Sequence, residues 1–138
     1  MSFEQIAKNL PALLGALLIC ILFIQSGLDK VFDWKGNIEW LTGHFSKSFL
    51  SRFVPIMLAK LTVLELATGI LSGVGITYFL IYGSTAVIFW AATLGALTVV
   101  GLFFGQRVAK DYAGAAILVP YFILLIIMIY LTNPYVRV

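Results

Sequence analysis

Four long apolar runs dominate this chain and limit what it can fold into. They cover Pro11–Ile24, Val54–Leu71, Ile76–Phe104 and Ala113–Thr132. A transmembrane helix needs roughly 20 mostly apolar residues to cross a hydrocarbon core, and each run is long enough or nearly so. Only 11% of the residues are charged and 62% are hydrophobic, whereas soluble domains have roughly a quarter charged residues. We therefore expect an all-α, integral membrane four-helix bundle.

The spacing of the runs predicts one transmembrane domain over residues 1–138, with helices at about 11–28, 54–74, 78–104 and 113–132. The segment 31–52 mixes tryptophan and phenylalanine with lysine, which is typical of a stretch lying in the membrane interface. The break between the second and third helices is expected within 72–75, or later, up to 82–84. The first run lacks a small-x-small cleavage site before a polar start, which favours a helix over a signal peptide.

Lysine and arginine predict the topology. After four crossings both termini lie on one side, which carries Lys8 and Arg137. The opposite side carries six cations, namely Lys30, Lys35, Lys47, Arg52, Arg107 and Lys110. The positive-inside rule then places the first and third loops in the cytoplasm and both termini outside. The net charge of +3 is spread over loops, so the expected partner is a lipid bilayer and not a nucleic acid, which needs a basic face.

Two charged residues fall inside the second helix. Lys60 and Glu65 would each cost roughly 2.5–3.5 kcal/mol at mid-membrane, so each needs a partner. They are five positions apart, about 140° around the helix, and do not face each other.

We expect the charged groups at this membrane face to form one intramembrane cluster of Asp29, Lys30, Lys60, Glu65, Arg107 and Asp111. The expected pairs are Asp29 or Asp111 with Lys60, and Arg107 or Lys30 with Glu65. Two interpretations stay open. The cluster is either a structural set of salt bridges or a site that handles protons or a quinone headgroup.

Small residues at helical spacing predict helix-packing surfaces, either within the chain or against a partner protein, at Gly69, Gly73, Gly95, Gly101 and Gly114. Cys20, the single cysteine, is expected to be a small core residue, because one thiol forms neither an internal disulfide nor a CxxC pair.

No pattern in the sequence predicts a catalytic residue or a metal site. His44 is the single histidine, so this chain alone cannot hold a bis-histidine haem, and we expect it to be solvated at the interface. There is no Cys/His cluster, no phosphate-binding glycine loop and no Ser/His/Asp set. We expect no cofactor bound by this chain alone, with a quinone or a lipid as the open ligand classes.

Three segments resemble the DoxX family of small four-helix membrane proteins. They are Ser26-Gly27-Leu28-Asp29-Lys30 at the end of the first helix, Glu65 with Gly69, Leu71 and Gly73 in the second, and the link from Gly105-x-Arg107 to Asp111-Tyr112. The resemblance spans about residues 13–131. The aromatic-rich segment after the first helix is unusual for it.

The resemblance implies an accessory subunit of a bacterial inner-membrane complex that is redox- or quinone-linked, without a redox centre in this chain. Larger membrane-protein subunits would be its partners. Two alternatives from other classes are a small solute or ion carrier acting as a homo-oligomer, and an assembly factor for membrane proteins. No internal repeat indicates the inverted halves common in transporters.

Overall fold

The computed structural model describes residues 2–135, and these form helices joined by short connections, without a strand among them. Four helices are long and apolar enough to cross a membrane, so the chain is a multi-pass membrane protein, as expected. The elements in chain order are α1 (Phe3–Lys8), α2 (Leu10–Phe32), α3 (Trp34–His44), the 3-10 turn η1 (Phe49–Phe53), α4 (Val54–Tyr82), α5 (Ala86–Val108) and α6 (Tyr112–Thr132).

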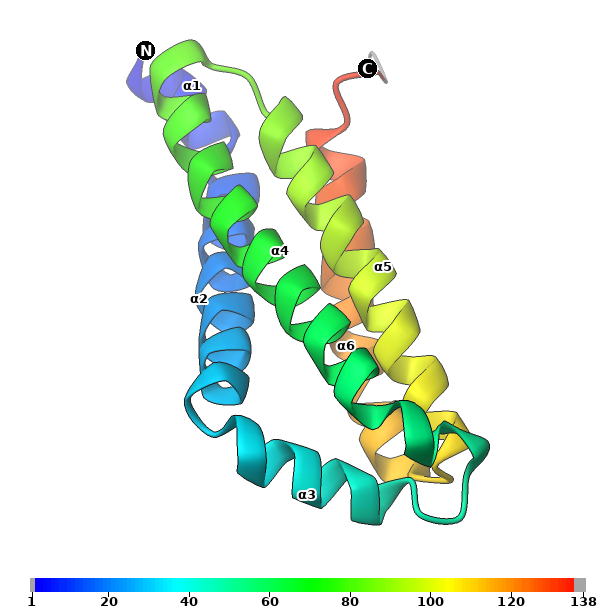
Figure 1. Ribbon diagram of the computed structural model, residues 1–138. Coiled ribbons are helices and arrows are strands. Elements are labelled where there is room, and N and C mark those ends of the chain that lie inside the picture. Colours follow the sequence, from blue (N-terminus) through cyan, green and yellow to red (C-terminus); the bar gives the residue numbers. More distant parts are fainter. Residues whose placement is uncertain (1, 136–138) are drawn as a thin grey trace.

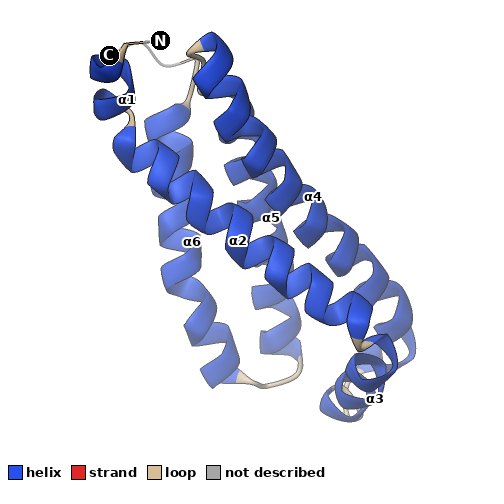
Figure 2. Cartoon of the chain, turned by 90° about the vertical axis from the view of Figure 1, so that its left-hand side faces the viewer, coloured by secondary structure: helices blue, strands red, loops and turns tan. Residues whose placement is uncertain are grey.

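The helices run up and down, so the described ends of the chain lie at one end of the bundle and α3 lies across the other (Figure 1). Helix α4 packs along α2 on one side and α5 on the other, and α5 packs along α6. Helix α2 meets α6 over a much shorter contact, as their divergence shows (Figure 2). Helix α3 occupies the expected interfacial segment, and its orientation across the bundle suits a helix lying at the membrane surface.

Helix α4 is longer than the expected 54–74, because residues 72–75 do not break it. They are helical, and Ser72 and Gly75 are buried. The Ser72 hydroxyl donates to the carbonyl oxygen of Ala16 in α2 at 2.7 Å. The break comes at the late limit of the expected range, at Gly83, whose φ of 75° is a left-handed conformation that glycine adopts easily.

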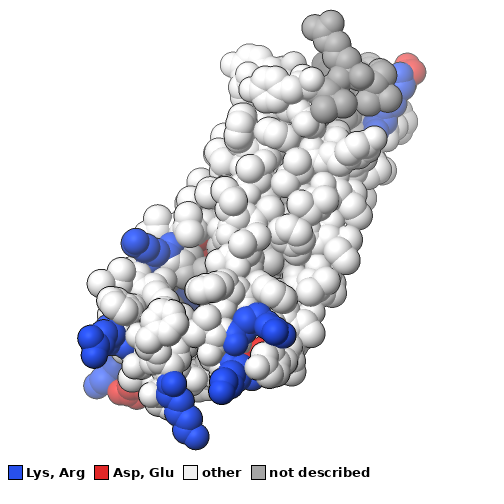
Figure 3. Space-filling view, turned by 90° about the vertical axis from the view of Figure 1, so that its right-hand side faces the viewer, with Lys and Arg blue, Asp and Glu red and all other residues white. Residues whose placement is uncertain are grey.

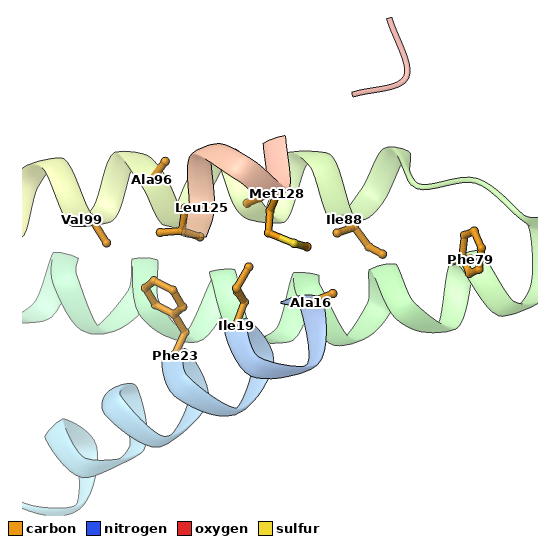
Figure 4. Close-up of a cluster of buried hydrophobic side chains, with 10 residues drawn as sticks. Ala16, Ile19, Phe23, Phe79, Ile88, Ala96, Val99, Leu125 and Met128 are labelled. Atoms are coloured by element: carbon orange, nitrogen blue, oxygen red, sulfur yellow. The ribbon is translucent and has the colours of Figure 1, made fainter. Parts of the chain in front are cut away.

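The core lies where all four long helices meet (Figure 4). Ala16, Ile19 and Phe23 enter it from α2, and Leu125 and Met128 enter it from α6. Most other large apolar side chains point outward and are exposed. In water this surface would be unfavourable, but lipid solvates it, and the helices satisfy their own backbone hydrogen bonds.

Three of the five expected packing glycines do pack helices together. A β-carbon on Gly69 would lie 2.9 Å from the backbone nitrogen of Ile24, and one on Gly73 would lie 3.3 Å from Cys20 Sγ, both in α2. Gly95 faces Leu125, Thr68 and Phe23. Cys20 is only half-buried, so it is not a full core residue.

The other two glycines do not pack long helices together within the described chain, and packing against a partner protein stays a prediction for them. A β-carbon on Gly101 would meet nothing within 4 Å. Gly114 lies against Asp111 and Gln106 at the turn between α5 and α6, so it serves the start of α6 and not a contact between long helices.

We predict that Gly69→Ala lowers the free energy of unfolding by about 1–3 kcal/mol, because the α2 backbone must move to admit the methyl group. Gly101→Ala, the matched control, should leave stability unchanged or raise it slightly, since alanine favours a helix more than glycine does. Unfolding in a detergent–SDS titration, followed by circular dichroism, measures both. Equal losses would contradict the close packing of α2 on α4.

Candidate functional site

A buried ion pair joins α2 to α4. Lys30 Nζ lies 3.0 Å from Glu65 Oε2 and 3.3 Å from Oε1. The side chain of Glu65 is 3% exposed and that of Lys30 is 18% exposed. Glu65 lies eleven positions beyond Val54, roughly 16 Å along the helix axis, so this carboxylate is deep within the bundle.

Ser26, one turn before Lys30 on α2, supplies further acceptors for this pair. The ammonium of Lys30 also donates to Ser26 Oγ at 2.9 Å and to the Ser26 carbonyl oxygen at 3.3 Å. Residues four apart lie on one helix face, which brings Ser26 and Lys30 together. The Lys30 ammonium therefore has both a counter-charge and two further acceptors, which a buried charge requires.

The other expected members of the cluster lie apart from this pair. Lys60 is exposed, and no carboxylate of residues 2–135 lies within ion-pair distance of it. Its expected pairing with Asp29 or Asp111 is therefore wrong. The physical reason is the turn of α4, which points Lys60 and Glu65 in different directions. Asp29 is exposed and enters no ion pair within the described chain.

Arg107 is also separate. Its guanidinium lies over the ring of Tyr112, 4.6 Å from the centroid, in a cation–π contact. The expected alternative, Arg107 with Glu65, is not formed. Of the expected pairs, Lys30 with Glu65 is the one that the structure brings together.

A second set of polar side-chain contacts holds α3 against the turn between α5 and α6. With its proton on Nε2, His44 donates to Gln106 Oε1 at 3.1 Å, and Asp111 Oδ2 lies 3.5 Å from the same nitrogen. The ring stacks on Trp40 with centroids 4.7 Å apart. Asp111 Oδ1 also accepts from the backbone N–H of Gly114 at 2.9 Å and so caps α6.

The expectation of a solvated His44 was wrong. Its side chain is 19% exposed, because α3 lies across the bundle and places its last turn against the start of α6. His44 lies far in the sequence from Gln106 and Asp111, so no local pattern indicated this contact. The aromatic neighbours of His44 are the one local signal of a buried ring.

Lys60 lines an apolar groove between α4 and α5, near α3. The groove encloses about 290 Å³, and its walls include Met57, Leu61, Leu97 and Leu102. A second, shallower groove of about 420 Å³ runs along α2 and α4 past Cys20 and Gly73. Within residues 2–135, no three His, Cys, Asp or Glu side chains are grouped to hold a metal ion.

Comparison with protein-family models, with curated proteins and with solved structures finds no match. The resemblance to the DoxX family stays a prediction. What the geometry adds is that two of the three segments carrying it meet in space. Lys30 and Ser26 come from the first segment and Glu65 from the second.

Basic side chains gather around the end of the bundle that carries α3, and few lie at the other end (Figure 3). This distribution agrees with the count of lysines and arginines in the loops. The assignment of the α3 end to the cytoplasm stays a prediction.

We predict that Glu65→Leu and Lys30→Met each destabilise the protein by about 3–5 kcal/mol, because each leaves one buried charge without its partner. The double variant should recover much of that loss. Detergent–SDS unfolding of the four proteins gives the coupling energy. The exposed pair Glu4–Lys8, 3.4 Å apart, is a matched control with an expected coupling of about 0.3–0.5 kcal/mol. Similar coupling at both pairs would contradict a structural role for the buried one.

We predict that His44→Phe loosens α3 while keeping the ring stacked on Trp40, because the contacts to Gln106 and Asp111 are lost. Amide hydrogen exchange of residues 34–44 should become faster. Thr42→Ala is the control, since the Thr42 hydroxyl donates within α3, to the Ile38 carbonyl at 2.7 Å. Unchanged exchange in His44→Phe would show that these polar contacts do not hold α3.

Proposed function

We propose that this chain is a DoxX-like accessory subunit of a bacterial inner-membrane complex, redox- or quinone-linked, without a redox centre of its own. The observation that carries the proposal is the buried Lys30–Glu65 pair. It joins two of the three segments on which the family resemblance rests, and among the ion pairs of the described residues it is the one whose carboxylate is almost fully buried.

In this proposal the pair is a proton-handling site beside a quinone or a partner subunit. A proton transferred from the Lys30 ammonium to the Glu65 carboxylate leaves both groups neutral. The pair therefore carries no net charge whether the proton is on Lys30 or on Glu65. Lys30 is more exposed than Glu65, 18% against 3%, and is therefore the group through which protons reach the pair.

The surface also supports a partner. Along α2 and α4 a shallow groove passes Cys20, Ile70 and Val74 and ends near Tyr78 and Tyr82. Its lining is mostly apolar, and the side chains of Ile70 and Val74 are exposed. A helix of a larger subunit would fit this face, directly beside the helices that hold the ion pair.

The first test is purification of the tagged chain in mild detergent, followed by mass spectrometry and an optical redox spectrum of what accompanies it. Stoichiometric haem- or quinone-linked subunits are the expected result. A colourless homo-oligomer would overturn the accessory-subunit proposal and favour a carrier. Client proteins bound in variable, substoichiometric amounts would overturn it in favour of an assembly factor.

We predict that Glu65→Gln inserts normally but impairs the activity of the complex, because an amide cannot take up the proton. Glu39→Gln, an exposed change on α3, is the matched control and should be silent. Membrane content by immunoblot and quinone-linked turnover in isolated membranes are the two readouts. Normal turnover with normal assembly in Glu65→Gln would rule out proton handling by the pair.

A further inference from the structure

The groove beside Lys60 has the shape of a site for a single hydrocarbon chain. Leu61 and Leu64 of α4 form one wall, Leu97 and Leu102 of α5 the other, and Phe45 lies at the end nearest α3. Its volume of about 290 Å³ is at the lower end of the roughly 300–1,000 Å³ of small-molecule sites.

The groove exists because α5 lacks a side chain at the point where one would fill it. Gly101 lines the groove, and a β-carbon there would meet nothing within 4 Å. An empty apolar space loses dispersion contacts on all its walls. In a bilayer the available filling is hydrocarbon, so an acyl chain lying along α5 restores those contacts.

Lys60 supplies the charge that such a ligand must match. It is exposed, lines the groove and has no carboxylate partner within residues 2–135. It lies six positions beyond Val54, roughly 9 Å along α4. From that depth a lysine extends its ammonium toward the headgroup layer, where the anion at hand is a lipid phosphate.

The remaining polar groups of the groove favour a phosphate over a quinone ring. A quinone carbonyl needs a hydrogen-bond donor, but the Thr98 hydroxyl already donates to the Leu94 carbonyl at 2.8 Å. The Lys60 ammonium lines the groove and can donate to either ligand, but a phosphate also brings the opposite charge, so its hydrogen bond to Lys60 is the stronger one.

We infer that this groove binds an anionic phospholipid, with its phosphate on Lys60 and an acyl chain against Gly101. This site is distinct from the Lys30–Glu65 pair, and the inference does not rest on the proposed accessory role. A lipid held here would fill the space between α4 and α5 beneath the last turn of α3.

The test uses the full chain, delipidated in mild detergent and titrated with phosphatidylglycerol or with phosphatidylcholine of the same acyl chains. Native mass spectrometry counts the bound lipid. Wild type should prefer phosphatidylglycerol. Lys60→Gln should weaken phosphatidylglycerol binding about fivefold, the effect of one basic residue near an anionic surface, and leave phosphatidylcholine binding unchanged. Gly101→Leu, which fills the groove, should weaken both.

Matched controls are Lys35→Gln and Gly43→Leu on α3. Lys35 is an exposed lysine outside the groove, and a β-carbon on Gly43 meets nothing within 4 Å. Both should bind lipid as wild type does.

Equal binding of the two lipids by wild type, or equal behaviour of Lys60→Gln and Lys35→Gln, would overturn the inference. Displacement of phosphatidylglycerol by a short-chain quinone, sensitive to Gly101→Leu, would also overturn it. If Gly101→Leu does not fold, the lipid binding of Lys60→Gln and Lys35→Gln still tests the inference.

Discussion

A carboxylate in hydrocarbon must find a counter-charge, and in this chain that requirement falls on Glu65. Its partner Lys30 sits on another helix, so neutralising the charge also fixes α2 against α4 in rotation and in height. Gly69 and Gly73 follow Glu65 at intervals of four residues on the same face of α4, where they let α2 approach closely. The ion pair and the small residues therefore impose the same helix register, one by charge and the other by shape.

This register has consequences at the end of the bundle that carries α3. With α2 held by its last turns, α3 must cross the bundle to reach the start of α4, and His44 then meets Asp111 at the turn before α6. Asp111 caps α6 with its other oxygen, so one carboxylate fixes both an interfacial helix and a transmembrane helix. Basic side chains and the groove beside Lys60 lie at this end, where the connection from α2 to α4 is long, whereas Gly83 turns the chain tightly at the other end.

The existence of the four spanning helices followed from hydrophobic length, since a bilayer leaves few alternatives for such runs. Their ends did not follow. The glycines and serine at 72–75 suggest a break by local rules, yet in lipid small residues are where helices touch, and tertiary packing decided. The sequence allowed two partners for Glu65, and Lys30 is one of them. Lys60 and Glu65 already point in different directions on α4 because of their spacing, so a single cluster of all the charged residues was not to be expected.

An ion pair is not needed to hold two helices together in a membrane. Apolar residues of similar volume often replace a buried ion pair at no cost or with a gain in stability, because the charges no longer have to be desolvated. Stability alone therefore gives no reason to place Lys30 and Glu65 here. An apolar pair cannot change its protonation, and Lys30 is partly exposed, which is why we propose proton handling for this pair. The proposed role and the helix register make different demands on one contact, because the register needs only that the charges cancel, whereas proton handling would need the carboxylate itself.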